Sequence, residues 1–152
     1  MNCKLILFAL TVSAIVPSFG QGTTGFTVVR GKDRPELIND ATAYLHLFRA
    51  LEQTQSESDL VFSRRRQALA KETGLGGPQI PLLLATADSF AQQGQALNWR
   101  MAPGLERQAA RAKMTLQLVN QLQQALGPHD AYLLTEYVNG VVKPQVTLYL
   151  PR

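Results

Sequence analysis

The distribution of apolar residues predicts two amphipathic helices within residues 78–127. In the first half of this stretch, apolar residues recur at alternating spacings of four and three positions. At about 100° per residue, they fall within a narrow arc of one helix face. The residues of this stripe are Leu83, Ala87, Phe90, Gly94, Leu97 and Met101. Gly94 costs about 1 kcal/mol relative to alanine inside a helix. Close approach of a second helix is the expected compensation, and a weak kink of the helix is the alternative.

The second half of the stretch carries two apolar stripes side by side. A helix that is apolar over about half of its circumference usually has neighbours on two sides. We therefore expect this helix to be central in the fold. Its first stripe consists of Leu105, Ala109, Ala112, Leu116, Val119 and Leu126, and its second of Met114, Leu118, Leu122 and Ala125.

The segment Met101-Ala102-Pro103-Gly104 separates the two helices. Proline moves the residue before it away from the α conformation, and glycine loosens the next position. An antiparallel turn lets each stripe pack on its chain neighbour, whereas a single long helix kinked at Pro103 is the alternative. In the antiparallel arrangement, Phe90 and Leu116 lie on facing stripes, so we expect both to be buried.

Two helices are expected before this pair. The first covers about residues 33–53, with Asp33 and Glu36 placed as a capping box and with a stripe of Leu37, Ala41, Tyr44, Phe48 and Leu51. The second runs from a cap at Ser56 or Ser58 through Lys71, with Val61, Phe62, Ala68 and Leu69 pointing inward. Gly74 followed by Leu75 is typical of a left-handed helix C-cap.

A closing helix and an extended tail are expected after the pair. Residues 128–139 predict a helix that Gly140 ends, with an inner edge of Leu134, Tyr137, Val138 and Val141. Residues 146–150 alternate with a period of two, as extended segments do. Their pairing with residues 26–29 would give a two-stranded ribbon, which needs helices beneath it to be stable.

These patterns together predict an all-α fold, with four to five short helices packed around a central antiparallel helical hairpin and short extended terminal segments. We expect a cleaved signal peptide at residues 1–20, a flexible leader at 21–33, a helical domain at 34–142 and an extended tail at 143–152.

The first twenty residues have the order of a secretory signal peptide. Lys4 precedes an apolar run at residues 5–16, Pro17 breaks it, and small residues end at Gly20. Cleavage there predicts an exported protein, periplasmic or extracellular, without a later transmembrane segment. It also removes Cys3, the only cysteine, and lowers the formal charge from +4 to +3 because Lys4 is lost. The mature chain would then form no disulfide.

Residues with catalytic or metal-binding chemistry are few. His46 and His129 are far apart in sequence and belong to no metal-ligand motif. Glu36 and Asp40 form the nearest thing to a carboxylate pair, and acids in a first helical turn are explained by the helix dipole. Asp130 beside His129 has no nucleophile in a recognisable turn. The sequence therefore predicts no cofactor, no metal and no assignable catalytic residue.

The run Arg64-Arg65-Arg66 is the only cluster of like charges. Successive helical residues point about 100° apart, so the three side chains fan around the helix and form no single patch. Few aromatic residues, a modest net charge and an exported address also argue against nucleic-acid binding.

Trp99 lies about 160° from the centre of its helix's apolar stripe. Either a flanking helix or the C-terminal tail covers it, or it is an exposed anchor for a partner protein or for self-association.

The sequence leaves two function classes open. The favoured one is a non-enzymatic protein-interaction module of the cell envelope or extracellular space. The alternative is a small secreted hydrolase-like enzyme with a site assembled from His46 or His129 and distant carboxylates.

Overall fold

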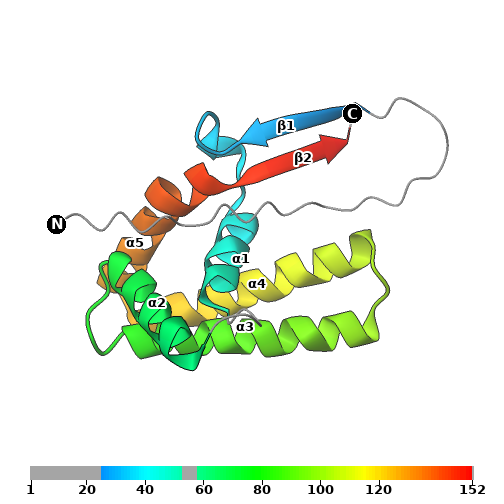
Figure 1. Ribbon diagram of the computed structural model, residues 1–152. Coiled ribbons are helices and arrows are strands. Elements are labelled where there is room, and N and C mark those ends of the chain that lie inside the picture. The colour runs from blue at the N-terminus through cyan, green and yellow to red at the C-terminus, as the bar shows by residue number, and fades with distance from the viewer. Residues whose placement is uncertain (1–24, 53–57, 152) are drawn as a thin grey trace.

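The two long helices form an antiparallel hairpin, as the apolar pattern predicts. In the computed structural model, which describes residues 25–52 and 58–151, they are α3 (Ile80–Arg100) and α4 (Leu105–Leu126) (Figure 1). Their mutual contact is the most extensive between any two described helices. The expected signal peptide at residues 1–20 lies outside the described residues.

Helix α4 is central, because it packs against α3, α1 (Asp40–Leu51) and α5 (Pro128–Tyr137). Its buried face takes Met114, Leu118 and Leu122 from the second predicted stripe, and Val119 and Leu126 from the first. The prediction for Ala125 was wrong, because this residue is exposed. The expectation for the first stripe was wrong over its N-terminal part: the neighbouring helices do not reach that side, so Leu105 and Leu116 are 83% and 42% exposed. The buried residues of α4 are Met114, Thr115, Leu118, Val119, Leu122 and Leu126.

Helix α1 begins at Asp40 and not at Asp33. Asn39 caps it, since its side-chain oxygen accepts a hydrogen bond from the Thr42 N–H at 2.8 Å. The preceding residues form a turn and a short 3₁₀ helix, Pro35–Leu37. Glu36 forms an ion pair with Arg34 there and does not take part in the predicted capping box. The buried residues of α1 are Ala43, Tyr44, Leu47, Phe48 and Leu51.

Helix α2 (Asp59–Glu72) is capped by Ser58, which accepts from the Val61 N–H at 3.4 Å. The C-cap prediction is confirmed: Gly74 has a φ of +81° and Leu75 is buried. The prediction that Val61 points inward was wrong, because α2 packs through its C-terminal part, where Leu69 and Ala70 are buried.

Helix α5 does not end at Gly140, which corrects the prediction. It continues into a π-helical turn, Val138–Val142, in which the Lys143 N–H donates to the Val138 carbonyl, and then into a 3₁₀ turn, Lys143–Gln145. The wider turn brings Val138 and Val142 to the inside and leaves Val141 exposed.

Strands β1 (Phe26–Arg30) and β2 (Thr147–Pro151) pair antiparallel, with Val28 opposite Tyr149. Part of the expected leader is therefore a strand. At the root of this ribbon the Gly31 N–H donates to the Val146 carbonyl at 2.7 Å. A Cβ atom at Gly31 would lie 1.8 Å from the Lys143 carbonyl oxygen, so only glycine fits there.

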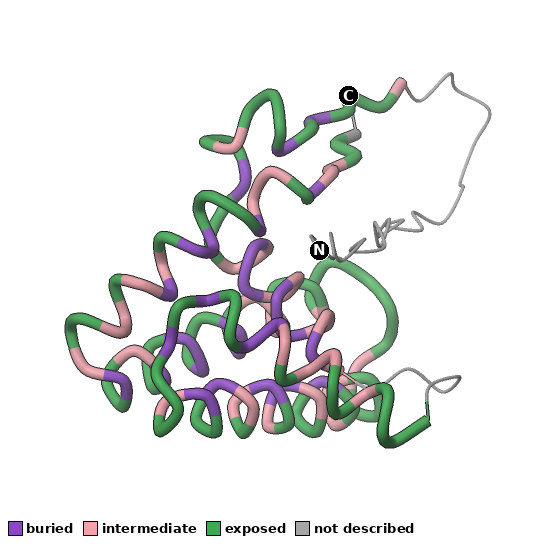
Figure 2. The backbone as a smooth tube through the Cα atoms, turned by 60° about the vertical axis from the view of Figure 1, so that its left-hand side comes forward, coloured by how far each residue is buried: buried purple, intermediate pink, exposed green. Residues whose placement is uncertain are grey.

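The core lies where α1 crosses the hairpin. The Phe48 ring is 5.4 Å from the Phe90 ring and 6.2 Å from the Tyr44 ring, measured between centroids. Figure 2 shows the buried positions gathered among the helices, whereas the ribbon is mostly exposed. The fold is thus mainly all-α, with a small two-stranded sheet.

Candidate interaction site

One end of the α3–α4 hairpin projects beyond the other helices (Figure 1). We call this part, residues 95–113, the free end. It contains no buried residue, although the same two helices are buried on one face along residues 80–94 and 114–126, which we call the near half. The free end is therefore helical structure that supplies little to the core.

Trp99 lies in the last turn of α3, within the free end, and is 90% exposed. No element of the described chain covers it. Leu105 begins α4 on the other side of the loop and is 83% exposed. The loop between them ends at Gly104, whose φ of +156° favours glycine. Two large apolar side chains thus flank one exposed turn.

Polar contacts connect the two helices within the free end. The Arg111 guanidinium donates to the Asn98 side-chain oxygen at 2.8 Å, and Arg107 donates to the Met101 carbonyl at 3.5 Å. The first bond joins α4 to α3, and the second joins α4 to the residue that follows α3, in a region without buried residues.

The free end is strongly basic. It carries Arg100, Arg107, Arg111 and Lys113 against a single acid, Glu106, which gives a net formal charge of +3. Among the described residues, no ion pair neutralises any of these four cations. Partial burial and the nearby Arg49 and Arg107 cations lower the pKa of Arg111, while the Glu52 carboxylate acts in the opposite direction.

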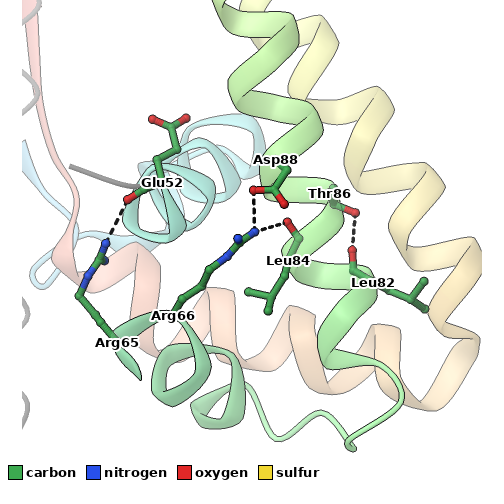
Figure 3. Close-up of polar contacts among 7 residues, drawn as sticks. All are labelled: Glu52, Arg65, Arg66, Leu82, Leu84, Thr86 and Asp88. Atoms are coloured by element: carbon green, nitrogen blue, oxygen red, sulfur yellow. Dashed lines mark hydrogen bonds and ion pairs between the residues drawn. The ribbon is translucent and has the colours of Figure 1, made fainter. Parts of the chain in front are cut away.

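The Arg64-Arg65-Arg66 run has a structural role at two of its three positions (Figure 3). Arg65 donates to the carbonyl groups of Ala50 and Glu52 at the end of α1. Arg66 donates to the Leu84 carbonyl at 2.5 Å and to the Asp88 carboxylate at 2.7 Å on α3. The run therefore joins α2 to α1 and α3, and Arg64 is its one exposed member.

The two histidines of the hydrolase hypothesis belong to different helices. His46 is half-buried on α1, where burial and the Arg49 cation lower its pKa, whereas His129 is exposed in the first turn of α5. Glu36 binds Arg34, which lowers the pKa of Glu36, and Asp40 binds Lys143 at 2.8 Å. Within the described chain, no three His, Cys, Asp or Glu residues are grouped to hold a metal.

An open depression lies where α4 meets α5. It is lined by Asn120, Gln123, Gln124, Gly127 and Pro128. None of these side chains titrates, so the depression offers hydrogen-bonding amides and no acid–base group.

None of the described helices has both the length and the apolar character needed to cross a bilayer. Comparison of the chain with protein-family models, with curated proteins and with solved structures found no significant match. The candidate site therefore rests on geometry alone. Sequence analysis singled out Trp99 by its helix face but missed Leu105, because an apolar stripe does not indicate by itself whether a neighbour covers it.

Proposed function

We propose that this chain is a non-enzymatic interaction protein, which binds another protein through the free end of its helical hairpin. The observation that carries the proposal is the exposure of Trp99 at a projecting end of the molecule. Tryptophan is the residue most enriched in interface hot spots, where it fills a pocket on the partner. Leu105, on the other side of the same turn, adds a second apolar contact.

The hydrolase alternative has no comparable support. An enzyme of that kind needs a concave site where a histidine and an acid converge. The depression between α4 and α5 is lined by amide side chains together with Gly127 and Pro128, and neither histidine lines it. His46 lies on α1 and His129 on α5.

We also propose export to the periplasm or the extracellular space, because residues 1–20 have the order of a signal peptide. Mass spectrometry of the protein purified from its own cell tests this point. The expected N-terminus is Gln21, and an intact Met1 on the exported protein would contradict it.

Affinity capture with cross-linking from the native envelope fraction tests the interaction. The mature protein is compared with Trp99→Ala and with Tyr132→Ala, a matched control in which another exposed aromatic is removed from α5. We expect one partner to be cross-linked by the wild type and by Tyr132→Ala, and to be lost with Trp99→Ala.

Thermal melts of the three proteins accompany the capture. We expect Trp99→Ala to change the melting temperature by no more than a few degrees, because the side chain has almost no contacts to lose. A collapse of stability, or capture of the same partner by Trp99→Ala, would refute the proposal.

A further inference from the structure

We infer that the partner bound by the free end presents an acidic protein surface. This inference rests on the proposed function and specifies the chemistry of the partner. Its basis is the charge of residues 95–113, which hold +3 of the chain's total formal charge of +4. The rest of the chain is close to neutral, so the positive charge is concentrated on the structure that projects.

None of the four cations forms an ion pair with another described residue. Arg100 and Lys113 are also exposed, so a partner can reach them directly. Arg107 donates to the carbonyl of Met101, just after α3, and Arg111 donates to the Asn98 side chain on α3, so both acceptors are uncharged. The Glu52 carboxylate offsets part of the charge of Arg111. Carboxylates on a partner would supply the missing counter-charges around the apolar contacts of Trp99 and Leu105.

The charge disfavours a second copy of this chain as the partner. An isologous dimer through the free end would bring two groups of net charge +3 together, and like charges at an interface suppress association.

The placement of the apolar residues favours a protein over a flat bilayer surface. Trp99 leaves α3 about 140° from the side on which α3 packs. The same face of α3 otherwise carries the polar Asp88, Gln92 and Gln95. A helix that lies in a membrane surface needs a broad apolar face, which this face does not provide, so a protein with a pocket for the indole is favoured.

Two double variants isolate the effect of charge. Arg100→Glu with Lys113→Glu reverses the two exposed cations and changes the charge of the free end from +3 to −1. Arg64→Glu with Lys71→Glu makes the same change in total charge on α2, at two exposed positions. Neither pair removes an ion pair between residues that the structure describes.

The first experiment repeats the cross-linking capture with these double variants. We expect the free-end variant to reduce the yield of the cross-linked partner at least about tenfold, and the α2 variant to leave it within about twofold. If Trp99→Ala abolishes capture but both charge variants bind as the wild type does, the proposed function stands and the acidic partner is refuted. If Trp99→Ala has no effect, the proposed function itself fails.

The second experiment uses the fluorescence of Trp99, which is the only tryptophan and so reports on this site alone. The probes are a helical peptide with leucine on one face and glutamate elsewhere, the same peptide with lysine for glutamate, and phosphatidylcholine vesicles containing phosphatidylglycerol. We expect a saturable blue shift with the glutamate peptide, weakened by salt, and none with the lysine peptide. A blue shift with the vesicles alone would overturn the inference in favour of a membrane. A concentration-dependent blue shift without any probe would overturn it in favour of self-association.

Discussion

The near half and the free end of the hairpin belong to the same two helices but are stabilised differently. In the near half, Leu83, Phe90 and Leu118 are buried against other elements, and burial of such side chains is worth about 1.5–3 kcal/mol each. In the free end, two arginine hydrogen bonds connect helices whose outer faces are exposed. Helical structure can therefore extend beyond the core that stabilises it. The side chains of such an extension stay exposed to solvent and are not needed for packing.

The largest test of this comparison uses two leucines of α4 that are two residues apart. Leu118 is 6% exposed and Leu116 is 42% exposed. We expect Leu118→Ala to lower the free energy of unfolding by about 2–5 kcal/mol and Leu116→Ala by less than about 1 kcal/mol, because only the first leaves a cavity. Urea denaturation measures both. Equal losses would show that the side of α4 bearing Leu116 is covered.

A second test concerns the attachment of α2 to the near half. Arg66→Met removes the hydrogen bonds to the Leu84 carbonyl and to Asp88 but keeps most of the aliphatic packing. We expect a loss of about 1–2 kcal/mol in the free energy of unfolding. Arg64→Met, the exposed neighbour, is the matched control and should change stability by less than about 0.5 kcal/mol. Similar values for the two would contradict a structural role for Arg66.

A third test acts at the border of the two regions. Gly94 is the last buried residue of α3, yet a Cβ atom there would meet no atom within 4 Å. The expected close approach of a second helix is therefore wrong. Gly94→Ala should raise the free energy of unfolding by about 0.5–1 kcal/mol, since alanine is the better helix former. A loss of stability would show that the helices come closer at this point than the structure has them.

The smallest expected effect is a pH dependence at His46. Burial and the Arg49 cation lower the pKa of His46 below its usual 6.5. The unfolded chain then binds the proton more tightly than the folded chain, so stability should decrease as the pH falls below about 6.5. His46→Gln should flatten the difference in unfolding free energy between mildly acidic and neutral pH. An unchanged slope in the variant would assign the dependence to other groups.

The helical hairpin could be predicted from the sequence because apolar spacing fixes which residues share a face. The start of α1 could not be predicted, because Asp33 and Asn39 are both acceptable caps. Residues 35–37 form a 3₁₀ helix after the ribbon, so the α-helix begins only after Asn39. Gly140 is typical of a helix end, yet the helical backbone continues past it as a π-helical turn in which Val138 and Val142 are buried. Local signals specify what is permitted, and tertiary contacts select among the permitted conformations.

The candidate site was predicted only in part. Trp99 could be identified because its position opposed the stripe of its own helix. The exposure of Leu116 could not be predicted, because the two stripes of α4 are similarly apolar. Which stripe is buried depends on where α1 and α5 pack. The contacts of Arg66 also escaped prediction, since they reach residues 18 and 22 positions away in the chain.

The ribbon has a consequence for the order in which this protein folds. Pairing Phe26 with Pro151 closes almost the whole described chain into one loop, and the entropy of that closure is lost before any strand contact compensates it. The helices, whose contacts are nearer in sequence, can assemble first and bring Gly31 and Val146 together. Amide hydrogens of β1 and β2 should then exchange with solvent sooner than those of the buried part of α4, because the ribbon can open while the helical core stays closed.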